Sequence, residues 1–146
     1  MKQAIETTYP ITFRKKESEV LGQYIKQNKS VVLIGMKRVG INNFLRFFLN
    51  HDNDKLHVFV KVDLNDLIER NISAFWTLLL TRLVDTVQGS TLPETDKRTC
   101  RKLFVQSIQL KDHFFTLDSV RKVLETLGHA GLYPTLFLIR FDRLQE

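Results

Sequence analysis

The sequence lacks the residues and segments on which several kinds of protein depend. Among its 146 residues there is a single cysteine, Cys100, which excludes an internal disulfide and cannot form a metal site alone. The longest apolar stretches, residues 31–34 and 136–139, fall far short of the roughly 20 residues that a membrane helix needs. The N-terminus, MKQAIETTYP, has no apolar core of the kind found in signal peptides. We therefore expect a cytoplasmic protein that does not enter a membrane.

Metal-ligand spacing and the common hydrolase patterns are also missing. The four histidines, His51, His57, His113 and His129, stand at no ligand spacing relative to one another or to Cys100. No serine lies in an elbow motif with histidine and aspartate partners. The sequence therefore predicts neither a histidine–cysteine metal site nor a serine hydrolase.

Positive charge is concentrated in the first third of the chain. Nine of the 22 Lys and Arg residues, but only three of the 16 Asp and Glu residues, fall in residues 1–50, which leaves 13 of each in residues 51–146. The net charge of +6 therefore belongs to the N-terminal segment. Such a segment suits an anionic partner, either nucleotide phosphate or nucleic acid, and it is equally consistent with a solvated basic surface. A second basic run, Arg98, Arg101 and Lys102, suits either contact with nucleic acid or a solvated surface.

Helical and strand-like patterns of apolar residues alternate along the chain. Apolar positions at three- and four-residue spacing predict helices over residues 17–25, 41–49, 73–87 and 117–127. Short continuous apolar runs predict strands over residues 31–34, 57–64 and 135–141. Strands separated by helices form parallel sheets through βαβ connections, so the predicted fold class is α/β.

Local patterns add expectations for individual segments. Residues 89–102 are polar and predict a surface loop or insertion, and residues 103–110 suit either a short helix or a strand. Thr116 is the expected N-cap of the last helix and Gly128 its expected end, with Phe114 and Phe115 anchoring the helix. The aromatic residues at helical spacing are expected in the core rather than as base-stacking platforms: Phe44, Phe47, Phe48, Phe75 and Trp76.

The most informative segment is VVLIGMKRVGINNFL, residues 31–45. An apolar run, two glycines five positions apart and an apolar helix follow one another, which is the frame of the P-loop G-x-x-x-x-G-K-[ST]. In a P-loop, backbone N–H groups of the glycine-bounded turn converge on a phosphate at a helix N-terminus. Gly35 and Gly40 supply that turn. Ile41 and Asn42, however, stand where lysine and a hydroxyl residue bind phosphate and magnesium.

Two interpretations of this segment remain open on its residues alone. In the first, it is a nucleotide-binding cradle in which Lys37 and Arg38 restore part of the missing positive charge. The predicted nucleotide-binding residues are then Gly35, Met36, Lys37, Arg38, Val39, Gly40, Ile41, Asn42 and Asn43. In the second, the glycines serve only the geometry of a strand–turn–helix connection.

Two further segments accompany the loop in a fixed order. FRKKESEVLGQYI precedes it, and TLFLIRFDRL follows much later in the chain. Together the three segments resemble the P-loop ATPases of the AAA+ and STAND type, in particular the prokaryotic ATPase-domain group. That family reads F-x-G-R-E-x-E-L, then G-P-R-R-V-G-K-T-S-L-L, then an apolar strand ending in D-E-F-D-R-L. The resemblance covers residues 13–144. It implies a P-loop NTPase-like three-layer α/β/α sandwich with a mostly parallel sheet, in one domain over residues 1–146, with ATP and Mg as ligands.

The departures from the family fall on the residues that carry its chemistry. In the third motif, the first acid binds magnesium through water and the second orients the attacking water; here Ile139 and Arg140 occupy those places. Asp142 is the nearest acid and the candidate metal ligand. Losing one transition-state contact can cost ~10²-fold or more in rate. We therefore expect a degenerate ATPase domain with weak or lost ATP binding and without efficient hydrolysis.

The resemblance also implies an incomplete sheet. In the family another strand lies between the P-loop strand and the third-motif strand, whereas this sequence reaches Glu146 directly after the third motif. The chain is therefore expected to be the N-terminal portion of an ATPase core, with an open sheet position that invites pairing. The alternative function is a non-catalytic association module, completed by a protein partner or by self-association. A third option is nucleic-acid binding by residues 1–50.

Overall fold

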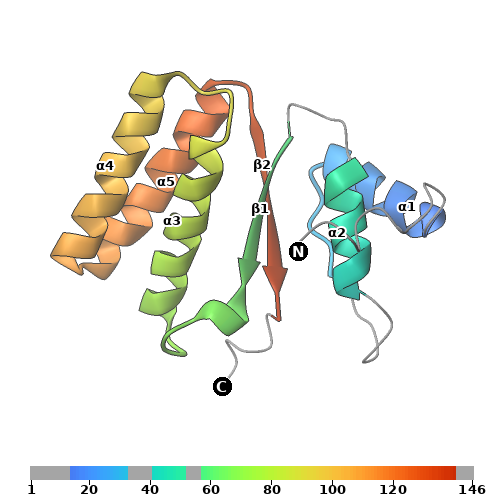
Figure 1. Ribbon diagram of the computed structural model, residues 1–146, viewed down its shortest axis with the longest axis horizontal. Coiled ribbons are helices and arrows are strands. Elements are labelled where there is room, and N and C mark those ends of the chain that lie inside the picture. Colours follow the sequence, from blue (N-terminus) through green and yellow to red (C-terminus); the bar gives the residue numbers. More distant parts are fainter. Residues whose placement is uncertain (1–13, 33–40, 52–56, 141–146) are drawn as a thin grey trace, which may run out of the picture. The chain divides into compact units, whose positions relative to one another are not determined.

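The computed structural model describes residues 14–32, 41–51 and 57–140, and of residues 41, 42, 50 and 51 it describes the backbone only. The chain divides into two compact units, Met1–Asp54 and Lys55–Glu146, where the sequence predicts a single domain. Figure 1 shows the helices and strands of both units. The described residues form helices and a parallel pair of strands, so the predicted α/β class is confirmed.

The described residues of the unit Met1–Asp54 form the helices α1 (Lys15–Lys26) and α2 (Ile41–His51), which confirms both helices predicted in this region. α1 buries Leu21. α2 buries four apolar side chains, namely Phe44, Leu45, Phe47 and Phe48. A Cβ atom added to Gly22 would lie 4.0 Å from Cε2 of Phe48. The two helices of this unit therefore pack against each other at Gly22.

The strand predicted over residues 31–34 does not form in its described half. Val31 and Val32 have no regular secondary structure and are 38% and 82% exposed, and residues 33–34 lie outside the described residues. A β-branched run favours a strand only where neighbouring strands accept its backbone hydrogen bonds. Neither of the described strands pairs with Val31 or Val32. The preference of these valines for extended backbone is therefore not enough to form a strand here.

In the described part of the unit Lys55–Glu146, three long helices lie between two parallel strands in chain order. The elements are β1 (His57–Asp63), the 3-10 helix η1 (Leu64–Asp66), α3 (Ile72–Gln88), α4 (Glu94–Leu110), α5 (His113–His129) and β2 (Tyr133–Ile139). β1 and β2 pair in parallel, with His57 opposite Tyr133 and Asp63 opposite Ile139. The three long helices lie on the same side of this sheet (Figure 1). The strands predicted over 57–64 and 135–141 are thus confirmed to within two residues, apart from Phe141, which lies outside the described residues.

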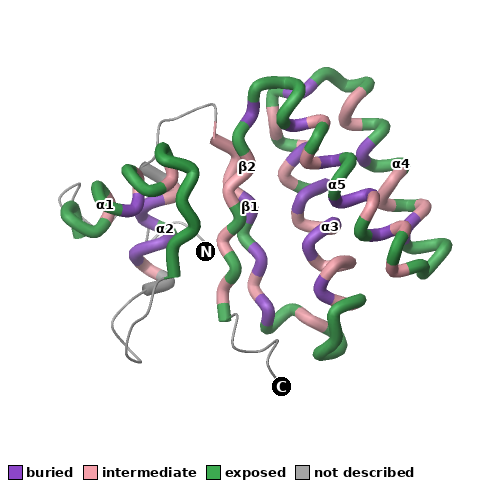
Figure 2. The backbone as a smooth tube through the Cα atoms, turned by 180° about the vertical axis from the view of Figure 1, so that it is seen from behind, coloured by how far each residue is buried: buried purple, intermediate pink, exposed green. Residues whose placement is uncertain are grey.

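One face of β1 packs into the core. Val60 and Val62 have no exposed surface, whereas Lys61 between them is exposed, which is the alternation that a strand imposes. α3 packs against β1, and α5 contacts β2. Figure 2 shows the buried positions of α3 and β1 within this unit. The sheet and the helical layer therefore share one core.

α3 lies at the centre of that core and contacts β1, α4 and α5. Its buried apolar residues recur at helical spacing: Phe75, Leu79, Leu80, Leu83, Val84 and Val87. The N-cap is Asn71, whose side chain accepts a hydrogen bond from the N–H of Ala74 at 2.8 Å. Between α4 and α5 the buried contact is polar, with Oγ of Ser107 donating to Oγ of Ser119 at 3.3 Å. These small side chains allow α4 and α5 to pack closely.

The surface loop predicted over residues 89–102 is wrong for most of its length, because α4 begins at Glu94. Glu94 and Asp96 in the first turn favour a helix start by interacting with the helix dipole. The polar residues form the exposed side of an amphipathic helix that buries Cys100. Residues 103–110, which suit a helix or a strand by pattern, are the second half of α4.

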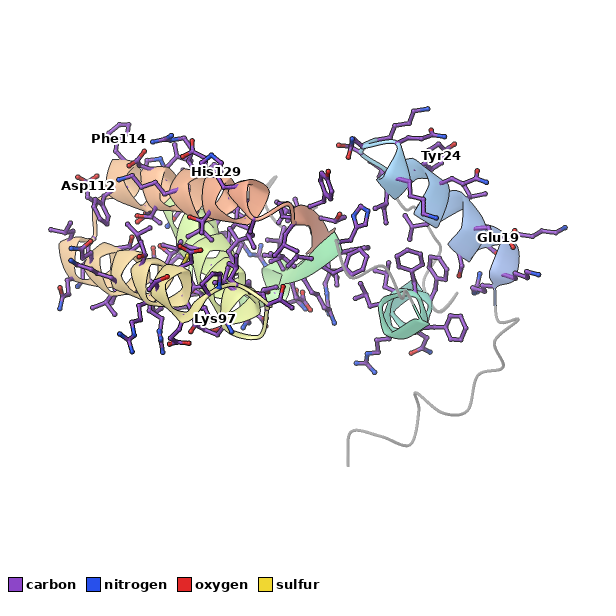
Figure 3. The ribbon with its side chains drawn as sticks, turned by 90° about the horizontal axis from the view of Figure 1, so that it is seen from above. Glu19, Tyr24, Lys97, Asp112, Phe114 and His129 are labelled. Carbon is purple, nitrogen blue, oxygen red and sulfur yellow. The ribbon has the colours of Figure 1, made fainter. Side chains whose placement is uncertain are left out.

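The last helix begins earlier than predicted. The N-cap of α5 is Asp112 rather than Thr116, since the Asp112 carboxylate accepts hydrogen bonds from the N–H groups of Phe114 and Phe115 at 2.9 and 3.4 Å. Thr116 is buried inside the helix, and its hydroxyl donates to the carbonyl of Asp112 at 3.0 Å. Phe114 does not anchor the helix: it is 79% exposed and extends outward from α5 (Figure 3).

α5 also extends one residue beyond the predicted end at Gly128. The helix ends at His129, and the left-handed backbone conformation falls on Gly131, with φ 74. The N–H of Gly131 donates to the carbonyl of Gly128 at 3.0 Å, and the N–H of Leu132 donates to that of Leu127 at 3.0 Å. A glycine beyond the helix end thus makes the turn into β2.

Candidate functional site

The carboxyl ends of β1 and β2 lie side by side because the strands are parallel. Asp63, the last residue of β1, stands opposite Ile139, the last residue of β2. Arg140 follows Ile139 and reaches back to Asp63, with Nη2 2.9 Å from Oδ2. Ligand sites of parallel α/β sheets form at the carboxyl ends of the strands. The Asp63–Arg140 pair is therefore the candidate site within the described residues.

Both carboxylate oxygens of Asp63 have hydrogen-bond partners. Oδ2 accepts from Arg140, and Oδ1 accepts from the N–H of Asn65 at 3.0 Å, which makes Asp63 the N-cap of η1. The side chains of Asp63 and Arg140 are 22% and 41% exposed. A pair with that much exposure contributes about 1 kcal/mol or less to stability.

Arg140 has a backbone conformation that its side chain disfavours. Its φ of 59 lies in the left-handed region, which costs a non-glycine residue roughly 1–2 kcal/mol. The ion pair contributes about 1 kcal/mol or less against this cost. Non-glycine residues in this region occur at turns and at functional sites, where the surrounding structure holds them. The strain thus adds to the reasons for regarding Arg140 as part of a site.

A second Asp–Arg pair holds the segment that follows β1. Nη2 of Arg82, on α3, lies 3.0 Å from Oδ2 of Asp66, on η1. Nη1 of Arg82 also lies 3.9 Å from Oδ2 of Asp85 one turn later. These contacts connect η1 to α3 and place the chain beside Asp63.

Most of the predicted nucleotide-binding segment lies outside the described residues, namely Gly35, Met36, Lys37, Arg38, Val39 and Gly40. Ile41 and Asn42 open α2, and Asn43 is half-buried in the same turn. α2 starts directly after Gly40, as the P-loop frame predicts, and its first turn contains no acidic residue. Asp142, the predicted metal ligand, also lies outside the described residues.

The described side chains at the strand ends do not fit a magnesium ion. In nucleotide sites, Mg²⁺ is held by one or two carboxylates together with water and phosphate oxygens. Here both oxygens of Asp63 are hydrogen-bonded, and the guanidinium of Arg140 adds a positive charge at the same place. In the described ranges, no group of three or more His, Cys, Asp or Glu residues could hold a metal ion.

An open groove of about 630 Å³, which no sequence pattern indicated, lies between α3 and α5. Its lining is mainly apolar and includes Trp76 on α3 and Phe114, Leu117 and Leu124 on α5. Leu117 and Leu124 lie seven positions apart on one side of α5. The groove shows that this side of the helix faces partly outward.

Charged residues at the rim of this groove are neutralised within α5. Arg121 lies 2.7 Å from Asp118 and 2.6 Å from Glu125. Hydrogen bonds donated by Arg121, and then by Lys122, hold the pKa of the Asp118 carboxyl below its usual range. The rim therefore presents little net charge to a ligand.

Cys100 is a structural residue, and the basic run of α4 is part of the solvated surface. Burial, and secondarily the charge of Asp96, raises the pKa of the Cys100 thiol, so this cysteine is a core residue rather than a nucleophile. In the basic run of α4, Arg101 and Arg98 approach the same carboxylate of Glu94, at 2.6 and 4.0 Å. These ion pairs favour the solvated-surface interpretation of the run.

Two broader observations bear on the class of protein. None of the described helices combines the length and the apolar character required to cross a membrane. Comparison of the chain with protein-family models, with curated proteins and with solved structures found no match. Function must therefore be argued from the residues of this chain and from their arrangement.

Proposed function

We propose that the chain is a P-loop-type nucleotide-binding module that does not hydrolyse ATP. The observation that carries the proposal is the ion pair between Asp63 and Arg140 at the carboxyl ends of the parallel strands. By the resemblance, Ile139 and Arg140 occupy the positions at which active ATPases place the metal-binding and water-orienting acids. A cation therefore stands at a position where catalysis needs an anion.

The proposed loss of hydrolysis follows from the charges at the carboxyl ends of β1 and β2. The guanidinium of Arg140 neutralises the carboxylate of Asp63, so the pair offers a divalent cation no net negative charge. Asp63 is already paired, since one of its oxygens accepts from Arg140 and the other accepts from the N–H of Asn65. Among the described residues at the strand ends, the carboxylates of Asp63 and Asp66 are thus both paired with arginines.

Nucleotide binding is supported by the start of α2 and by the charge of the chain. α2 begins immediately after Gly40 and has no acid in its first turn, so its N-terminal N–H groups suit an anion. The net charge of +6 lies in the same part of the sequence. In the proposed fold, a three-layer P-loop sandwich, the unit Lys55–Glu146 supplies two parallel strands and one helical layer.

Calorimetric titration of the whole chain with ATP tests the proposal. We expect binding that is at least as tight in EDTA as with excess Mg²⁺, and no phosphate release above the blank. A failure to bind ATP up to about 1 mM, or turnover that depends on Mg²⁺, would contradict it. Ile41→Lys restores the missing P-loop cation and should tighten binding about tenfold or more, while Ile41→Met, its uncharged control, should leave affinity unchanged.

A second candidate function is a non-catalytic association module. The specific observation that favours it is the set of exposed apolar side chains in the unit Lys55–Glu146, among them Phe114, Tyr133 and Leu136. This function would not require nucleotide, so it predicts self-association or partner binding that ATP leaves unchanged.

A further inference from the structure

We draw no further inference here: the strongest candidate, the groove between α3 and α5 that Trp76, Phe114, Leu117 and Leu124 line, is an apolar face, and nothing in the structure shows what covers it.

Discussion

Substitutions at Asp63 and Arg140 can separate three contributions to stability at the strand ends: the ion pair, the cap of η1 and the backbone strain of Arg140. Asp63→Asn keeps an oxygen that can accept from the N–H of Asn65 but removes the ion pair, so the free energy of unfolding should fall by about 0.5–1 kcal/mol. Asp63→Ala also removes the cap of η1 and should cost about 1–2 kcal/mol in total. The difference between the two variants measures the cap.

Arg140 tests the strain in the same way. Arg140→Ala removes the ion pair and keeps the left-handed backbone, so it should cost about 0.5–1 kcal/mol. Arg140→Gly removes the pair but also relieves a conformation that costs roughly 1 kcal/mol, so stability should stay unchanged or rise slightly. A double-mutant cycle between Asp63→Asn and Arg140→Ala should give a coupling of about 0.5–1 kcal/mol.

Urea unfolding followed by circular dichroism, at low and at high salt, supplies these free energies. High salt should reduce the coupling, because both side chains are partly exposed. The reasoning is refuted if Arg140→Gly costs as much as Arg140→Ala, since the backbone strain would then be absent. It is also refuted if the coupling is zero within error at low salt.

Three further predictions concern the unit Lys55–Glu146. Lys111 follows α4 with φ 51, so Lys111→Gly should raise the free energy of unfolding by about 0.5–1 kcal/mol. Lys102→Gly, inside α4, should lower it by about 1 kcal/mol. Equal effects of the two substitutions on urea unfolding would contradict the assigned helix end. Leu83 is fully buried and Ile68 is 97% exposed, so Leu83→Ala should cost about 2–5 kcal/mol and Ile68→Ala under about 0.5 kcal/mol, by the same unfolding measurement. The carboxyl of Asp118 should titrate below its usual range by NMR, so its stabilising contribution is complete above that range and is lost as pH falls through the lowered pKa; Arg121→Gln should move the midpoint upward, and an unmoved midpoint would exclude Arg121 as the main cause.

The elements that sequence predicts best are those whose pattern reflects burial directly. α3 is recognisable because its apolar residues face one core on a single long stripe, and Val60 and Val62 identify β1 by alternation. α4 is difficult to recognise from the sequence because its buried stripe is narrow, so that a mainly polar segment resembles a loop. The start of α5 is misplaced because Asp112 and Thr116 are both good capping residues, and only the bonds to the N–H groups of Phe114 and Phe115 distinguish them.

The candidate site is the part that sequence could not assemble. Asp63 and Arg140 are 77 residues apart, and nothing local to either residue indicates the other. The resemblance marks Arg140 as the replacement of a catalytic acid, but it says nothing of the carboxylate that the guanidinium then binds. The left-handed conformation of Arg140 is equally unpredictable, since such positions usually hold glycine.

The parallel pairing of β1 and β2 has a consequence for how the unit Lys55–Glu146 folds. Each register pair joins residues 76 positions apart, as 133 minus 57 shows for the first pair. Such distant contacts slow folding, because the chain loses the entropy of a long loop before the pairing repays it. We expect α3, α4 and α5 to associate first and the sheet to form late. During synthesis, β1 leaves the ribosome well before β2, and its apolar face depends on α3 for cover in the interval.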